Sequence, residues 1–125
     1  MKLFFILGNQ LFPTKYLDRF KKDHLFFMAE DKGLCTYEKH HKQKILLFLS
    51  SMRSYAEALR KNKFKLDYFK IEDKEFNDDY LKKLKKIFSQ KKVKEISSFE
   101  IEDKFFEIKI SQFLKKEKIH WNVVQ

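Results

Sequence analysis

Polar residues that could bind a ligand follow the first two apolar segments of the chain. Residues 2–7 form an apolar run that ends in Gly8, Asn9 and Gln10, and the second run ends at Glu30. A glycine lets the backbone turn sharply and approach a ligand, while two amides offer donors and acceptors. Glu30 could accept hydrogen bonds from hydroxyls or ring nitrogens, or it could equally cap a neighbouring helix. Together these residues favour a site for a flat ligand with polar groups at its edge.

A second group of candidates begins the longest helical pattern and follows the fourth apolar run. Tyr37 precedes the adjacent pair His40-His41, and Glu100 follows the fourth run. Adjacent helical side chains point about 100° apart, so the two histidines cannot both ligate one metal. A basic cluster at a helix N-terminus opposes the macrodipole, and such a violation of local rules tends to mark function. The carboxylates of Glu100, Glu102 and Asp103 could instead cap the last helix.

The sequence contains no recognisable catalytic constellation. It has no Ser-His-Asp set with an elbow motif, no cysteine beside a plausible base and no glycine-rich phosphate loop. The single cysteine, Cys35, excludes a disulfide framework and a structural zinc site built from cysteines. These residues therefore predict a ligand-binding domain with neither a catalytic site nor a metal site of its own.

Short apolar runs alternate with helical periods along the chain, and these elements must position the candidates. Strands are predicted at residues 2–7, 25–29, 65–71, 93–99 and 119–124. Helices are predicted at residues 14–22, capped by Thr14, at 38–61, after Asn77 or Asp78, and at 103–116. This order predicts an α/β, three-layer Rossmann-like sandwich with a five-stranded parallel sheet, order 3-2-1-4-5. Its carboxyl edge, where ligands bind, would hold the candidate residues.

Length and composition restrict the function further. The chain has 125 residues, which predicts one domain over residues 1–125, and no run approaches the length of a membrane span. With no signal peptide recognisable, we expect a soluble, cytoplasmic protein without a membrane partner. The net charge is +10, but arginine, the residue of dedicated phosphate and base recognition, is scarce among the 28 basic residues. We expect lysine-rich stretches such as 82–86 to lie on solvated helix faces.

Several short motifs, taken in order, carry a resemblance to a known family. They are Gly8-Asn9-Gln10-Leu11, Met28-Ala29-Glu30, Thr36-Tyr37, His40-His41-Lys42-Gln43-Lys44-Ile45 and Ser51-Met52-Arg53. They resemble the deoxyribodipyrimidine photolyase-related proteins, which include the iron–sulfur bacterial cryptochromes and (6-4) photolyases. The similarity extends over essentially the whole chain. The family typically has Asp where Asn9 stands, and its segment after the fourth strand matches at Glu100 but not at the residues that follow.

The resemblance implies an N-terminal α/β domain that binds an antenna chromophore, 6,7-dimethyl-8-ribityllumazine. A helical C-terminal domain, of the same chain or of a partner, would hold FAD, the 4Fe-4S cluster and most of the DNA-binding groove. The implied function is light harvesting for a DNA-repairing lyase, with no catalytic residue in this chain. The implied chromophore-binding residues are Gly8, Asn9 and Gln10 at the pyrimidine edge, Glu30 and Lys44 at ribityl hydroxyls or ring carbonyls, Ile45 and Phe48 as apolar contacts, and Tyr37, His41 and Glu100 nearby.

Two other functions remain open from the residues alone. A basic, non-enzymatic nucleic-acid-binding module would use the +10 charge and bind DNA with a steep salt dependence. A nucleotide-binding enzyme domain would share the same α/β architecture, although no residues suited to phosphate activation occur together. Without the resemblance, these two functions and the antenna function would be nearly equal alternatives.

Overall fold

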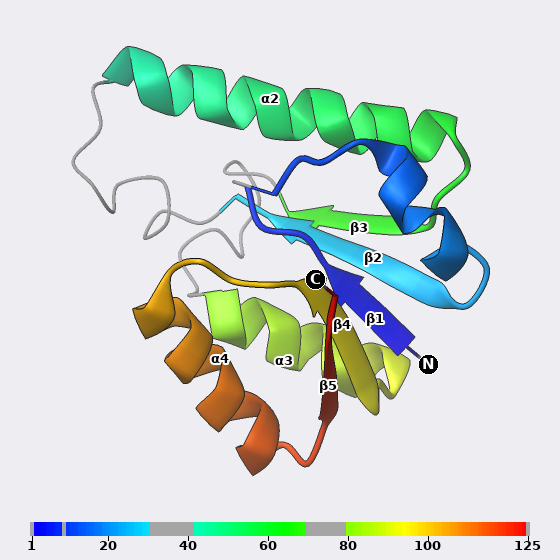
Figure 1. Ribbon diagram of the computed structural model, residues 1–125, viewed down its shortest axis with the longest axis vertical. Coiled ribbons are helices and arrows are strands. Elements are labelled where there is room, and N and C mark those ends of the chain that lie inside the picture. Colours follow the sequence, from blue (N-terminus) through cyan, green and yellow to red (C-terminus); the bar gives the residue numbers. More distant parts are fainter. Residues whose placement is uncertain (1, 9, 31–41, 70–79, 125) are drawn as a thin grey trace.

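The computed structural model describes residues 2–8, 10–30, 42–69 and 80–124, with the side chains of residues 42–46 and 80 outside the description (Figure 1). The elements are β1 (Lys2–Phe5), the 3-10 helix η1 (Thr14–Phe20), β2 (His24–Ala29), α2 (Lys42–Lys61), β3 (Leu66–Phe69), α3 (Tyr80–Lys91), β4 (Glu95–Phe99), α4 (Lys104–Lys116) and β5 (His120–Val124). The five strands form one parallel sheet in the order β3-β2-β1-β4-β5. The predicted fold class and strand order are confirmed.

Helices cover both faces of the sheet, which explains why the central strand β1 is apolar on both sides. α2 and η1 lie on one face, and α3 and α4 lie on the other (Figure 1). In β1, Leu3 and Phe5 join the apolar cluster under α3 and α4, while Phe4 joins the cluster under α2. All three side chains are fully buried. A parallel strand buried on both faces reads as a continuous apolar run, because neither face is left to polar residues.

The structure corrects two local predictions and confirms a third. Thr14 was predicted to cap the first helix, but Pro13 occupies the cap position and no side chain bonds the free N–H groups there. Asp103 caps α4 as predicted, because its carboxylate accepts from the backbone N–H groups of Phe105 and Phe106. Lys83 was expected on a solvated face, yet it is 1% exposed. The alternative caps at residues 77 and 78 lie outside the described residues.

Three helices end in the same way, with a lysine where glycine is usual. Lys63, Lys92 and Lys118 follow α2, α3 and α4 and have φ values of 66°, 52° and 58°. The N–H group after each lysine bonds the carbonyl five residues earlier, as from Phe64 to Leu59 (2.9 Å). This is the Schellman arrangement, in which the left-handed residue is normally glycine because a Cβ is strained there. These lysines therefore hold a conformation that local preference disfavours.

Among the described helices, none combines the length and the apolar character that crossing a membrane requires.

Candidate functional site

The segments that follow β1 and β4 are fastened together at the carboxyl edge of the sheet. Gln10 is 4% exposed and uses both ends of its amide. Its Oε1 accepts from the backbone N–H of Leu7 (3.3 Å), and its Nε2 donates to the backbone oxygen of Glu100 (2.9 Å). The side chain of Glu100 itself is exposed. Gln10 therefore fixes the geometry of two loops at the edge where ligands bind in such sheets.

Gly8 permits the first of these loops to lie directly against α2. A Cβ placed on Gly8 would lie 2.3 Å from Cζ of Phe48 and 3.0 Å from Sδ of Met52. Real Cβ atoms do not approach other atoms so closely, and Gly8 does not have a positive φ. The glycine is therefore required by close packing rather than by a turn, and it brings two predicted site residues, Gly8 and Phe48, into contact.

A buried carboxylate ends β2 and joins three elements. Glu30 is 0% exposed, and its Oε2 and Oε1 accept from Nε (2.7 Å) and Nη2 (2.9 Å) of Arg53 on α2. The hydroxyl of Tyr68 on β3 also donates to Oε2 (2.6 Å). From the opposite face of the sheet, Nζ of Lys83 donates to the backbone oxygen of Glu30 (3.3 Å). A bidentate arginine fixes the orientation of a carboxylate as well as its charge. We call Glu30, Arg53, Tyr68 and Lys83 the Glu30 cluster.

Two tyrosines on the α2 side have hydroxyls that resist ionisation. Burial, followed by the hydrogen bond to Glu30, raises the pKa of Tyr68 far above its usual value. Burial raises the pKa of Tyr55 to about 12. The Tyr55 hydroxyl donates to the backbone oxygen of Phe12 (2.6 Å), which fastens the segment between β1 and η1 to α2. Both hydroxyls therefore act as neutral donors that hold the site together.

We expect the free energy of unfolding to fall as the pH rises through about 10 toward 12, because the unfolded phenols ionise near pH 10 while the folded ones stay protonated. A Tyr55→Phe, Tyr68→Phe double variant should show a flatter dependence over this range. Urea unfolding at several alkaline pH values measures it. Tyr16→Phe, at a tyrosine that is 53% exposed, is the control. Equal slopes for the parent and the double variant would contradict the assignment.

An open groove lies between the loop after β1 and the flank of α2. It has a volume of about 510 Å³ and is lined by Leu11, Leu47, Ser50, Ser51, Ser54 and Tyr55. Figure 1 shows the chain between β1 and η1 running beside α2, which forms one wall of this groove. The three serine hydroxyls and Leu47 come from α2, and Leu11 comes from the loop after β1. Such a mixed polar and apolar lining suits a ligand with both a polar chain and an apolar ring.

The structure brings only some of the predicted site residues together. Gly8, Gln10, Glu30 and Phe48 converge at the carboxyl edge beside α2, and Glu100 contributes its backbone oxygen rather than its carboxylate. Lys44 and Ile45 belong to α2, but their side chains lie outside the description. Asn9, Tyr37 and His41 lie outside the described residues.

Arg53, Tyr68 and Lys83 were missed as members of the site. Arg53 stands in the motif Ser51-Met52-Arg53 and is one of three arginines in a lysine-rich chain, and that scarcity was an available signal. Lys83 stands among other lysines, so its burial had no signal in the sequence. Within the described parts of the chain, no group of three or more His, Cys, Asp or Glu side chains is placed to hold a metal ion.

The region that contains these residues is shared with known proteins. The family model described as deoxyribodipyrimidine photo-lyase-related protein matches residues 4–125. A (6-4) photolyase of Agrobacterium fabrum is 38% identical over 74 residues, which are 58% of this chain and 15% of the relative. The matched region is thus a small part of the length of that relative.

Proposed function

Because the chain belongs to the deoxyribodipyrimidine photo-lyase-related protein family, we propose that it is the light-harvesting domain of a photolyase- or cryptochrome-like DNA repair flavoprotein. The proposed ligand is 6,7-dimethyl-8-ribityllumazine. The observation that carries the proposal is the convergence of Gly8, Gln10 and Glu30 at the carboxyl edge of the sheet beside α2. These residues end or follow two different strands, and each is fixed by packing or by hydrogen bonds.

The lumazine is proposed to bind in the groove between the loop after β1 and α2. Its volume of about 510 Å³ lies within the range of small-molecule sites. The hydroxyls of Ser50, Ser51 and Ser54 could pair with the hydroxyls of the ribityl chain, and Leu11 and Leu47 could contact the ring. The groove lies where the loop after β1 meets the long helix, the place that the sequence motifs suggested for the chromophore.

The residues of the site would bind and orient the chromophore, and they need not transfer protons. When bound, the lumazine supplies absorption of near-UV or blue light. An antenna depends on a fixed orientation, and the hydrogen bonds from Arg53 to Glu30 hold α2, which supplies most of the groove lining, against the end of β2. Gln10 fixes the loops after β1 and β4 in the same way.

The other cofactors of the proposed flavoprotein would lie outside residues 1–125. A 4Fe-4S cluster needs four cysteine ligands, and the sequence contains one cysteine. The family resemblance implies that FAD, the cluster and the main DNA-binding groove belong to a helical domain of the same chain or of a partner. Excitation would pass from the lumazine to the flavin there.

Titration of the protein with 6,7-dimethyl-8-ribityllumazine tests the proposal through changes in absorbance and fluorescence. We expect binding, and we expect Ser54→Leu to weaken it at least tenfold because the larger side chain fills the groove. Ser89→Leu, at an exposed serine on α3, is the matched control and should bind as the parent does. No spectral change at tens of micromolar lumazine would refute the antenna function, and equal affinity of the Ser54→Leu variant would refute the groove as its place.

A further inference from the structure

The four described connections that run from a helix into a strand all reach the same edge of the sheet. Because the strands are parallel, the amino ends of β1 to β5 and the last turns of η1, α2, α3 and α4 share this edge, which is opposite the candidate site (Figure 1). We call segments 21–23, 60–65, 91–94 and 115–118, together with Lys2, the basic edge. The basic edge therefore lies at the amino ends of the described strands.

The basic edge contains far more positive than negative side chains. Its basic residues are Lys2, Lys21, Lys22, Arg60, Lys61, Lys63, Lys65, Lys91, Lys92, Lys94, Lys115, Lys116 and Lys118. All of these are exposed except Lys21, which is partly buried. The four segments hold two acidic residues, and both are engaged: Asp23 with Lys2 (3.6 Å) and His24 (2.7 Å), and Glu117 with Lys85 (3.5 Å). Glu95, which directly follows the third segment, also pairs with Lys2 (3.6 Å). The positive charge of the edge is thus largely uncompensated.

Helix stability alone does not explain all of these lysines. A basic residue in the last turn of a helix is favoured by the macrodipole, which accounts for Lys61, Lys91 and Lys116. The left-handed positions after the three helices are different, because glycine would be more stable there. Lysine stands at all three of them, so this edge gains positive charge at a cost in backbone strain.

We propose that the basic edge binds the phosphate backbone of double-stranded nucleic acid without reading its sequence. Five strands about 4.8 Å apart spread the charges over roughly 19 Å, so several lysines can contact successive phosphates at once. Lysine binds phosphate as a point charge, whereas base recognition relies on the planar fork of arginine, which the edge offers only at Arg60. The affinity of the basic edge for the duplex would then come mainly from the release of counterions from the phosphates.

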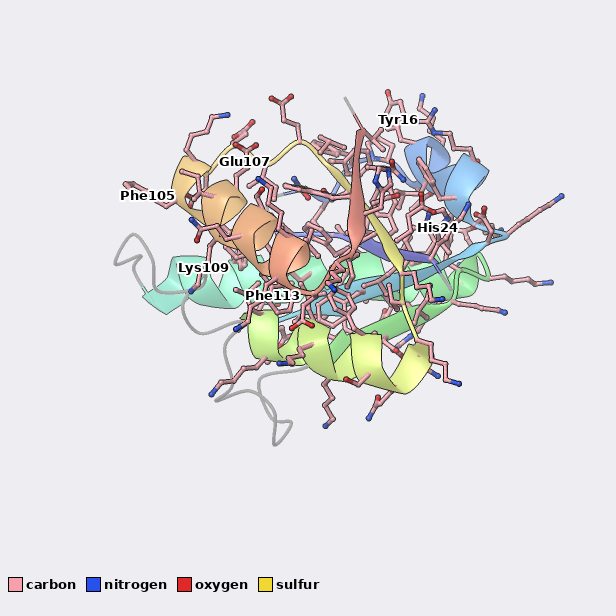
Figure 2. The ribbon with its side chains drawn as sticks, turned by 90° about the horizontal axis from the view of Figure 1, so that it is seen from below. Tyr16, His24, Phe105, Glu107, Lys109 and Phe113 are labelled. Carbon is pink, nitrogen blue, oxygen red and sulfur yellow. The ribbon has the colours of Figure 1, made fainter. Side chains whose placement is uncertain are left out.

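The same surface is poorly suited to other acidic partners. The exposed large apolar residues are Phe12, Tyr16, Leu47, Phe105, Ile108 and Val123, and none of them belongs to the basic edge. A membrane-binding surface needs apolar side chains that enter the lipid, and a single strand needs exposed aromatic rings on which its bases stack. Phe105, the most exposed of the six, projects from the first turn of α4, far from His24 at the amino end of β2 (Figure 2). Backbone contact with a duplex remains the matching chemistry.

The inference does not rest on the antenna function, since the two sites lie at opposite edges of the sheet and their tests share no variant. The probe is a fluorescently labelled DNA duplex of about 20 base pairs, which is longer than the edge. Anisotropy titrations at increasing NaCl concentration give the dissociation constant and its dependence on salt. Lys63→Gln, Lys92→Gln, Lys118→Gln is the edge variant, and Lys82→Gln, Lys104→Gln, Lys109→Gln is the control with equal loss of charge.

We expect the parent to bind the duplex with a steep salt dependence. The edge variant should bind at least about tenfold more weakly near 50 mM salt, with the slope of log K against log salt reduced by about three. The control should lose much less, because Lys82 and Lys104 lie in the first turns of α3 and α4 and Lys109 projects away from the edge (Figure 2). Equal losses in the two variants, or none in the edge variant, would overturn the proposal.

Two further measurements separate binding from folding and from other anions. Glycine at positions 63, 92 and 118 removes the same charges and relieves the left-handed strain, so Lys63→Gly, Lys92→Gly, Lys118→Gly should melt no lower than the parent and still lose duplex affinity. Retained affinity in this variant contradicts the proposal. So would tighter binding to single-stranded DNA of the same length, or to phosphatidylserine vesicles, than to the duplex.

Discussion

Replacing Arg53 by methionine is expected to lower the free energy of unfolding by about 3–5 kcal/mol at neutral pH. Methionine keeps much of the apolar contact on α2 but leaves the carboxylate of Glu30, which is 0% exposed, without its bidentate partner. A buried charge that loses its counter-charge carries its full desolvation cost. Urea unfolding monitored by circular dichroism measures the loss. The deficit should shrink toward acidic pH, because a buried carboxyl group without a cation can take up a proton.

The reverse substitution is expected to cost less, and this asymmetry tests the explanation. In Glu30→Gln the unmatched group is Arg53, whose side chain is 36% exposed and can be hydrated. We expect a loss of about 1–2 kcal/mol for Glu30→Gln. The double variant Arg53→Met, Glu30→Gln should be more stable than Arg53→Met alone, since the buried carboxylate charge that lost its guanidinium partner is removed as well. A double variant less stable than either single variant would show that the pair does not act through its charges.

A methyl group at Gly8 is expected to disturb both stability and the site. In Gly8→Ala the new Cβ would lie 2.3 Å from Cζ and 2.8 Å from Cε1 of Phe48, so the loop after β1 or the Phe48 ring must move. Overpacking of this kind typically costs about 1–3 kcal/mol. Because the loop forms one wall of the proposed groove, lumazine affinity should fall as well. Thermal unfolding and the lumazine titration measure the two effects on one sample.

A second substitution, at Phe48, shows whether the clash with its ring causes the loss of stability. Phe48→Leu removes the two ring atoms that the new methyl group meets, and the Met52 sulfur at 3.0 Å belongs to a flexible side chain. The double variant Gly8→Ala, Phe48→Leu should therefore lose less stability than the sum of the single losses. Strict additivity would mean that Gly8 is needed for another reason, such as its backbone freedom.

The architecture could be predicted from the sequence because hydrophobic period and element order are local signals. The five apolar runs and the helical patterns between them indicate a parallel sheet with right-handed crossovers, and the observed strand order is one of the few that these rules allow. Boundaries were less certain: the first strand was predicted over residues 2–7 and spans Lys2–Phe5, although Ile6 and Leu7 stay buried. The cap at Asp103 was predictable because its partners lie two and three residues away.

The site could be predicted only in part, because its contacts join residues distant in the chain. Gly8, Gln10 and Glu30 were found from their place after strands. Their partners were not, since Arg53 lies 23 residues after Glu30 and Tyr68 lies 38 residues after it. Whether a helical residue meets a given strand end depends on how the helix is placed on the sheet, which periodicity does not specify.

The sequence alone determined the α/β class and the absence of a recognisable catalytic motif. It also determined which polar residues follow the strands at the edge of the sheet. Among the described candidates, Gly8, Gln10 and Glu30 follow β1 and β2, as first inferred from their types and spacing. Tertiary structure decided what those groups contact: Glu30 is bound by Arg53 and Tyr68, and Lys83 is buried beside it. It also gathered lysines from separate connections at one edge. Both outcomes depend on packing between elements. The hydrophobic period of a segment shows which face of its helix or strand a residue lies on. Which residues of other elements that face contacts is decided only when the sheet and its helices are assembled.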